Sequence, residues 1–281
     1  MKTRKVRTLI PGMETSDGAG VRLRRSLGQS QSVRLDPFLM LDEFSSENPD
    51  DYVAGFPDHP HRGFETVTYM LDGHMLHQDH LGNRGDLKSG GVQWMTAGRG
   101  IIHSEMPQQS EGRMRGFQLW INLPAAEKMK PAGYRDITPE EIPECRFEGG
   151  RAKVIAGELR IGGESVRGPM SGLTTDPQYY DLNLEAGSTV SLPIPESHNA
   201  LVYVFEGALD IGGKQVPVHH AAVLDDGDAL EAKADEEGAR FLVLAGIPLG
   251  EPVVQYGPFV MNTTEEIEQA LRDYRAGRLA Q

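Results

Sequence analysis

The sequence lacks the features that mark secreted, membrane-spanning and nucleic-acid-binding proteins. Its single cysteine, Cys145, excludes a disulfide within the chain and gives no sign of an oxidising compartment. No run comes near the roughly 20 apolar residues that cross a bilayer, and the basic start, MKTRKVR, is not followed by the apolar core of a secretion signal. We therefore expect a soluble, cytoplasmic protein that makes no membrane contact.

Positive charge is also scarce. The formal net charge is −13, and beyond the first residues the densest basic run is RLRR at 22–25. Because a polyanion is bound by a concentrated basic face, we expect no direct contact with nucleic acid. The chain instead has an ordinary globular composition, 38% hydrophobic and 25% charged, with 33 glycines and 18 prolines. That composition favours many turns and short strands over long helices.

Short runs of alternating apolar and polar residues fill residues 5–125 and are divided by turn clusters. Such runs are typical of a β-sandwich or barrel, and examples are VRTLI, ETVTYML, GVQWM and GFQLWINL. Residues 126–150 are rich in proline and charge, which predicts a surface crossing between two domains. We expect an N-terminal domain of residues 1–140 and a C-terminal domain of residues 141–281.

A weak internal repeat links the two halves. NALVYVFEGALDIGG at 199–213 parallels ETVTYMLDGHML at 65–76, and Tyr69 and Tyr203, each four residues before a glycine, are 134 residues apart. The repeat predicts two copies of one barrel. The last part of the chain differs, because TTEEIEQALRDYRAG combines a Thr-x-x-Glu cap, apolar residues at helical spacing and a final glycine. It predicts one short amphipathic C-terminal helix.

Two pairs of polar residues suggest a metal site. His59 and His61 begin the run HPHRGFETVTYMLDG, and His103 and Glu105 follow a glycine-rich turn in GRGIIHSEMP. In a strand, residues i and i+2 project to the same side, roughly 7 Å apart. A lone histidine in a β-protein is usually a surface or hydrogen-bonded residue, but two such pairs favour ligation. If their strands are neighbours, three imidazoles and one carboxylate leave positions open on an octahedral metal.

The other candidates are weaker. Strand alternation puts Glu65 on the histidine face too, which makes it a second candidate carboxylate. His74, His77 and His80 fall in a hairpin after Gly73, where hydrogen bonding is a better interpretation than a second metal.

The repeat also gives an expectation for the second barrel. The positions 134 residues after the ligand-type positions of the first barrel hold Pro193, Pro195 and Asn199. None of these retains the ligand type, so we expect the second barrel to bind no metal and to have a structural role.

These motifs resemble those of known proteins. Gly55, His59, His61, Glu65 and Gly73 are spaced as in the first cupin motif, and GRGIIH at 98–103 resembles the later one. Four longer stretches resemble the pirin family: DPFLMLDEF at 36–44, HPHRGFETVTY at 59–69, VQWMTAGRGIIHSEMP at 92–107 and FQLWINLP at 117–124. The likeness continues more weakly after residue 140.

The resemblance implies a bicupin, an all-β protein of two double-stranded β-helix (jelly-roll) barrels in tandem. It also implies one mononuclear metal in the N-terminal barrel. The pirin-type ligands would be His59, His61, His103 and Glu105, and the cofactor would be one divalent metal ion, Fe(II) first, with other transition metals open. The general cupin pattern would use Glu65 instead. The closer pirin motif favours Glu105.

The resemblance further implies an iron-dependent quercetin 2,3-dioxygenase that cleaves a planar flavonol with O₂ and releases CO. Glu105 would then be both a ligand and the catalytic base. The alternative is a non-catalytic, redox-sensing iron protein that binds partners such as transcription regulators. A third interpretation, a cupin isomerase or hydrolytic metalloenzyme, predicts activity with zinc or manganese that does not need oxygen.

Overall fold

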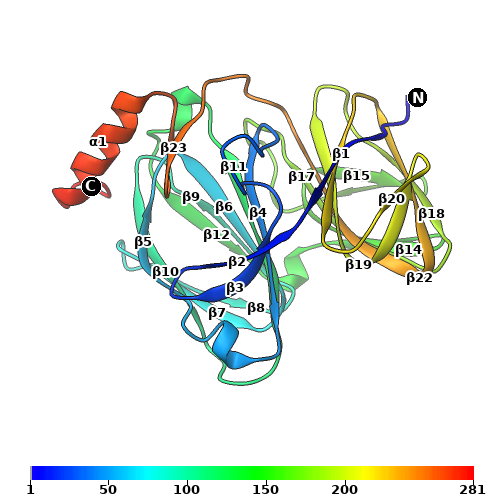
Figure 1. Cartoon of the computed structure of the whole chain (residues 1–281), viewed down its shortest axis with the longest axis horizontal. Coiled ribbons are helices and arrows are strands. Elements are labelled where there is room, and N and C mark those ends of the chain that lie inside the picture. The colour runs from blue at the N-terminus through cyan, green and yellow to red at the C-terminus, as the bar shows by residue number, and fades with distance from the viewer. Residues whose placement is uncertain (1) are drawn as a thin grey trace. The chain divides into compact units, whose positions relative to one another are not determined.

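The fold is almost entirely β-structure (Figure 1). The computed structural model describes residues 2–281, and among them the only α-helix is α1 (Thr264–Arg275). The predicted all-β class, with two barrel units and a short C-terminal helix, is confirmed. No helix in this described part of the chain is long and apolar enough to cross a membrane.

The chain forms two compact units, each of which is discontinuous in sequence. We call them the N-terminal barrel (Met13–Arg34, Phe38–Pro139 and Leu249–Gln281) and the C-terminal barrel (Glu140–Pro248, Leu35–Pro37 and the chain start through Gly12). This division differs from the predicted continuous domains, 1–140 and 141–281, although the unit does change close to residue 140.

The difference has a separate physical cause at each end of the chain. Strand β1 (Val6–Pro11) extends the sheet of the C-terminal barrel, because it pairs antiparallel with β21 (His220–Leu224). Helix α1 buries Ile267 and Ala270 in one cluster with Phe259, so its apolar stripe belongs to the N-terminal barrel. Hydrogen bonds at the sheet edge and burial of apolar side chains therefore decide which unit each end of the chain joins, and proximity in sequence does not.

The N-terminal barrel has two main antiparallel sheets, ordered β12-β9-β6-β11-β4-β3-β2 and β5-β10-β7-β8. The larger sheet consists of β2 (Met13–Asp17), β3 (Val21–Arg25), β4 (Phe38–Ser46), β6 (Phe64–Asp72), β9 (Val92–Thr96), β11 (Met114–Asn122) and β12 (Gly133–Ile137). The smaller consists of β5 (Phe56–His61), β7 (His74–Asp79), β8 (Arg84–Lys88) and β10 (Ile101–Pro107), and a hairpin adds β23 (Val254–Tyr256) and β24 (Phe259–Met261). Since β10 lies between β5 and β7, the two predicted ligand pairs lie on neighbouring strands.

The C-terminal barrel is one sheet in the order β1-β21-β19-β22-β17-β14-β13, with β18 and β20 at its sides and a separate β15–β16 hairpin. Its strands are β13 (Glu144–Phe147), β14 (Gly150–Ala156), β15 (Glu158–Ile161), β16 (Glu164–Arg167), β17 (Gln178–Leu184), β18 (Thr189–Pro193), β19 (Asn199–Ile211), β20 (Lys214–Val216) and β22 (Ala229–Gly246). Its core is apolar and includes Leu182, Val202 and Phe241. Tyr203 on β19 is fully buried, as is its repeat partner Tyr69 on β6.

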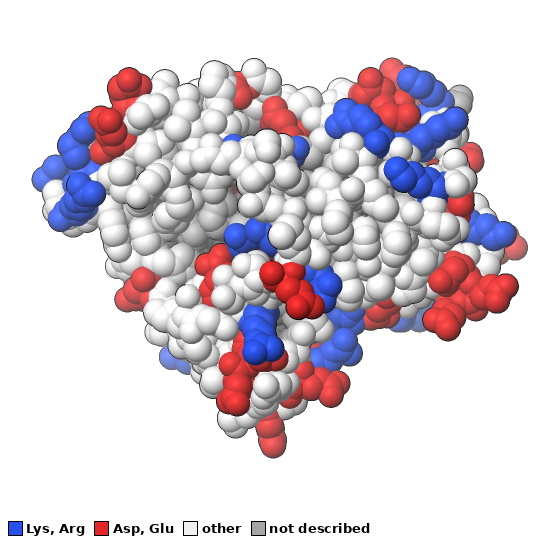
Figure 2. All heavy atoms as spheres, viewed as in Figure 1, with Lys and Arg blue, Asp and Glu red and all other residues white. Residues whose placement is uncertain are grey.

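Helix α1 begins and ends as predicted. Thr263 and Glu266 form a capping box, and Gly277 just after the helix has a φ of +66°. Acidic residues occupy the first turn and basic residues the last turn, which complements the helix dipole. Figure 2 shows this as red and blue ends of the helix at the left of the view. Three 3₁₀ turns also occur in the described chain: η1 (Pro49–Asp51), η2 (Ala125–Glu127) and η3 (Pro139–Glu141).

Candidate metal centre

Three histidines meet where β5 and β10 pair. In the register of these strands, His59 lies opposite His103. The ring centroids are 4.3 Å apart for His59 and His103, 4.7 Å for His59 and His61, and 4.9 Å for His61 and His103. Their candidate ligand nitrogens lie within 4.8 Å of one another, and no second group of this kind occurs among the described residues. Imidazoles gathered in this way suit a divalent transition metal.

A β-bulge and a glycine shape this end of the barrel. Glu105 lies opposite Phe56 and not Pro57, so β5 contains one extra residue next to the histidines. Gly63 then carries the chain from β5 into β6 with a φ of +92°, and a Cβ there would collide with the carbonyl oxygen of Val260. Only glycine fits this position.

Two of the three histidines, His61 and His103, are suited to bind a cation because burial favours their neutral form. Burial lowers the pKa of His61 and of His103 well below the usual histidine value, and neighbouring imidazoles lower both further. Nδ1 of His61 and Nε2 of His103 are buried and have no hydrogen-bond partner among the described residues. Nδ1 of His59 lies 2.8 Å from the Pro57 carbonyl oxygen, which leaves its Nε2 available. Neutral imidazoles with unsatisfied nitrogens fit a metal ion.

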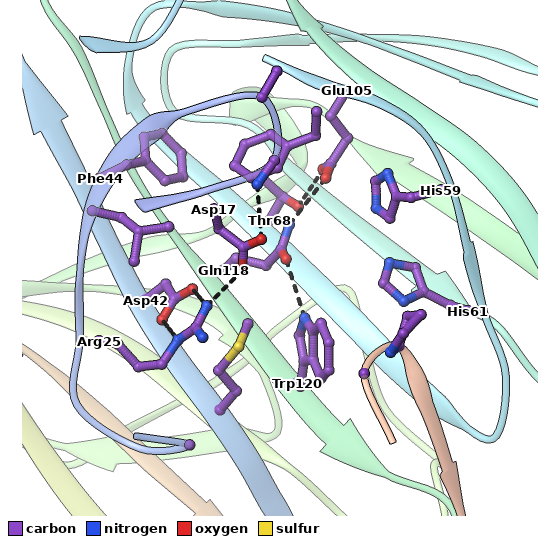
Figure 3. A pocket seen from close by; sticks show the side chains of 18 of the residues that line it. Asp17, Arg25, Asp42, Phe44, His59, His61, Thr68, Glu105, Gln118 and Trp120 are labelled. Carbon is purple, nitrogen blue, oxygen red and sulfur yellow. Dashed lines mark hydrogen bonds and ion pairs between the residues drawn. The ribbon is translucent and has the colours of Figure 1, made fainter. Parts of the chain in front are cut away.

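Glu105 lies on the wall of the same cavity and is 2% exposed. Thr68 Oγ1 donates to its Oε1 at 3.0 Å, and Gln118 Nε2 donates to its Oε2 at 3.1 Å. Trp120 Nε1 in turn donates to Gln118 Oε1 at 3.1 Å, which fixes the orientation of that amide. Figure 3 shows this chain of contacts beside His59 and His61. The carboxylate is near the histidines but is not part of the cluster of three nitrogens.

The structure does not place Glu65 among the histidines. Its carboxylate accepts hydrogen bonds from Trp94 Nε1 at 3.2 Å and Thr96 Oγ1 at 2.6 Å. Thr68, three residues later on β6, faces the cavity, so Glu65 faces the other way. The predicted alternation fails because the chain leaves β5 at His61 and restarts as β6 at Phe64. Of the two candidate carboxylates, the geometry favours Glu105.

A further histidine lies near the site, although the sequence led us to expect only a hydrogen-bonding role for it. His77 lies on β7 and is 1% exposed, and its Nδ1 is 3.3 Å from Nδ1 of His103. Burial lowers its pKa. His74 and His80 instead bond Asp86 at 3.0 Å and the Ala280 carbonyl oxygen at 2.9 Å, as expected of hydrogen-bonding residues. The sequence HMLHQD forms strand β7, and its fourth residue, His77, is buried there. A buried histidine on this strand was the signal that was missed.

A cavity of about 620 Å³ is lined by His59 and His61. That volume is within the range of small-molecule sites. Apolar side chains, including Leu39, Met40, Phe44 and Phe56, make up much of its wall, and Trp120 lines it next to Gln118. A planar apolar molecule could therefore lie with one polar group at the histidines.

Comparison with known proteins gives the same family as the motifs. Residues 20–121 match the pirin family, and residues 179–280 match the pirin C-terminal cupin domain. A Pseudomonas aeruginosa protein named "Putative quercetin 2,3-dioxygenase" is 58% identical over 281 residues, which cover 99% of this chain and 98% of that protein.

Solved structures share the fold. A quercetin 2,3-dioxygenase from Acinetobacter baumannii superposes with a TM-score of 0.90 at 34% identity, over 99% of this chain and 98% of that one. A bacterial pirin from Escherichia coli in complex with nickel(II) superposes with a TM-score of 0.63 at 21% identity, over 86% and 98% of the two chains. That last likeness is one of fold alone. Because both halves of the chain match and a full-length relative is this similar, the chain belongs to the pirin family.

Proposed function

We propose that this chain is a cytoplasmic, metal-dependent flavonol 2,3-dioxygenase in which His59, His61, His103 and Glu105 hold one divalent metal ion. One observation carries the proposal: three imidazoles, two of them buried and with unsatisfied nitrogens, are clustered, and His59 and His61 of this cluster line a cavity of about 620 Å³. The name of the relative at 58% identity supports the choice of substrate class.

When bound, the metal would supply a Lewis acid for a substrate oxygen and a redox centre for O₂. The chain supplies the remaining functions. Thr68 and Gln118 hold the two oxygens of Glu105, so the carboxylate is positioned to accept the proton of a flavonol 3-hydroxyl. Phe56 and Trp120 on the cavity wall would exclude water from the bound ring system. Overall, one O₂ is taken up, the C2–C3 and C3–C4 bonds both break, and C3 leaves as CO. The two oxygen atoms end on C2 and C4, which leaves an ester at C2 and a carboxylic acid at C4.

Fe(II) is the metal proposed. Histidine and carboxylate ligands accept several divalent metals, so the metal content of the isolated protein must be measured alongside activity. Samples loaded with Fe(II), Mn(II), Ni(II) or Zn(II) should then be compared for O₂ uptake, and the proposal expects the iron form to be active.

The test is O₂ consumption and CO release with quercetin. We expect about equal amounts of O₂ used and CO formed, loss of both metal and activity in His59→Ala, and a larger loss of activity than of metal in Glu105→Gln. Glu111→Gln, an exposed carboxylate beyond β10, is the matched control and should behave as wild type. A protein that holds one metal ion yet consumes no O₂ would reject the oxygenase and favour the redox-sensing regulator.

A further inference from the structure

The cavity has a second polar end. Arg25 on β3 makes a bidentate ion pair with Asp42 on β4, with Nε 2.8 Å from Oδ1 and Nη2 2.7 Å from Oδ2. Nη2 also donates to Oδ2 of Asp17 at 2.8 Å, where β2 ends. All three side chains line the cavity. Figure 3 shows them on the wall opposite His59 and His61.

This ion pair is in an unusual place for a purely structural one. Asp42 is 3% exposed, and burial raises its pKa to about 6 in spite of the facing guanidinium. Removing two charges from water costs about as much as their attraction returns, so a buried ion pair is weak evidence for stability. Pockets that bind small molecules, however, combine apolar walls with a few fixed polar groups. The cluster of Asp17, Arg25 and Asp42 fits that description.

The cluster has one donor nitrogen left, Nη1 of Arg25, which carries two protons. Nε and Nη2 of Arg25 are committed to the two carboxylates, whereas no partner for Nη1 is found in the described chain. The Arg25 side chain keeps 21% of its surface exposed, and that of Asp17 keeps 50%. Each carboxylate oxygen also retains acceptor capacity beyond the bond it already makes. A ligand group here can therefore accept from Nη1 and donate to Asp17.

The charge of the cluster narrows the ligand further. With both carboxylates ionised, the three side chains sum to one negative charge, so an anionic ligand group is repelled. A group that is neutral, and both accepts and donates, satisfies the free positions. An aromatic hydroxyl has these properties.

We propose that Asp17, Arg25 and Asp42 form a hydroxyl-selective subsite for the end of the substrate remote from the histidines. The substrate class is thereby narrowed to planar molecules with a neutral phenolic hydroxyl on an outer ring. The inference deepens the proposed function and depends on it only for the flavonol skeleton. The subsite selects substrate by its outer ring and takes no part in bond cleavage.

Equilibrium binding without oxygen tests the subsite separately from turnover. Both tryptophans of the chain, Trp94 and Trp120, are in the N-terminal barrel, and Trp120 lines the cavity. Quenching of their fluorescence can therefore report binding. Four probes are compared. 3-Hydroxyflavone has no outer-ring hydroxyl, galangin adds hydroxyls on the fused ring, and kaempferol has one more hydroxyl on the pendant ring. The fourth probe, 4′-carboxy-3-hydroxyflavone, carries a carboxylate on the pendant ring instead. We expect at least one hydroxylated probe to bind about tenfold or more tightly than 3-hydroxyflavone, since a hydrogen bond to a charged group is worth that much. The carboxylated probe should bind no more tightly than 3-hydroxyflavone.

Two variants and a control complete the test. Asp17→Ala, in a half-exposed side chain that should leave folding intact, and Arg25→Met should each reduce the preference for hydroxylated probes at least threefold. Glu14→Ala removes an exposed carboxylate from the same strand, one that pairs with Arg24 and is not part of the cavity wall, and should keep the preference. Equal binding of all neutral probes by wild type, tighter binding of the carboxylated probe, or an unchanged preference in Asp17→Ala would overturn the proposal. Selective binding without any O₂ uptake would contradict the proposed dioxygenase activity but would support the subsite.

Discussion

His77 shows how a side chain outside the proposed ligand set can fix one inside it. The Nδ1 atoms of His103 and His77 are 3.3 Å apart. If Nε2 of His103 binds the proposed metal, that nitrogen carries no proton, and Nδ1 of His103 would then donate to Nδ1 of His77. We predict that His77→Phe, which keeps the buried ring but removes the acceptor, weakens metal affinity by about 10- to 100-fold. Competition with a chelator of known affinity measures it.

The control for that prediction lies on the same strand. His74 is partly exposed and bonds Asp86, so His74→Phe should leave metal affinity unchanged. Equal affinities in His77→Phe and wild type would mean that the contact with His103 does not position the ligand.

Asp42 makes a prediction about stability and pH. Burial raises its pKa from 3.8 to about 6, so the folded protein binds this proton more readily than the unfolded chain. Protonation therefore favours folding, and the contribution of Asp42 to the free energy of unfolding grows as pH falls from about 6 towards 4. It is lost again as pH rises.

Asp42→Asn cannot titrate, which isolates this contribution. We subtract the free energy of unfolding of the variant from that of the wild type. We expect this difference to be about 2 kcal/mol more positive at pH 4.5 than at pH 7, which means that the wild type gains stability at the lower pH. Urea unfolding followed by tryptophan fluorescence measures it, because both tryptophans are in the N-terminal barrel. A difference that is constant or that shrinks at low pH would contradict the prediction.

At the residue scale, the sequence was enough to predict side-chain positions that depend on local spacing. His59, His61 and His103 could be found because i and i+2 residues share a strand face. The side chain of Glu65 was misplaced because the turn at Gly63 interrupts the alternation. The contact between Arg25 and Asp42 joins two strands through an ion pair that no local pattern records.

At the element scale, strands were easier to predict than their partners. The runs at β6, β9 and β11 were recognised from alternation, and the helix from its cap. Residues 126–150 were predicted only as a surface crossing between domains, yet they contain β12, which pairs with β9, and β13, which pairs with β14. Both are edge strands with exposed, charged residues, so they lack the apolar signal of a central strand.

Lys128 joins three segments of the chain that are distant from one another in sequence. It is 1% exposed, and Nζ donates to the Gly63 carbonyl oxygen at 2.7 Å, to Asn122 Oδ1 at 2.6 Å and to the Val260 carbonyl oxygen at 3.0 Å. An ammonium group has three protons for these three acceptors. Burial lowers its pKa to about 8, so it is still a cation at neutral pH.

We predict that Lys128→Met destabilises the N-terminal barrel by about 2–4 kcal/mol, since three buried acceptors lose their donor. Urea unfolding followed by tryptophan fluorescence measures the loss. Lys130→Met is the matched control: its side chain is 31% exposed and bonds Glu127 at 2.9 Å, so its effect should stay under about 1 kcal/mol. Equal effects in the two variants would show that the three contacts add little.

At the scale of the whole molecule, one barrel architecture occurs twice with different interiors. Tyr69 and Tyr203 occupy matching buried positions in the two barrels. The C-terminal barrel encloses an apolar core, with Leu182, Val202 and Phe241 among its members. The N-terminal barrel instead has polar groups at both ends of an open cavity. The weak repeat in the sequence indicated the duplication, and the side chains that fill each barrel decide whether it encloses an apolar core or a cavity with polar ends.

Metal removal should therefore affect the two barrels unequally. A ligand that binds only the folded state stabilises it by about 2.7 kcal/mol at 100 times its dissociation constant, and the candidate ligands lie on β5 and β10 alone. We predict that chelation speeds amide hydrogen exchange in peptides covering β5, β7 and β10 and leaves β19 and β22 unchanged. Mass spectrometry of exchanged peptides measures both barrels in one experiment. His59→Ala should exchange like the chelated protein from the start and should not respond to chelator. Equal changes in β19 and β22, or none in β5 and β10, would place the metal elsewhere.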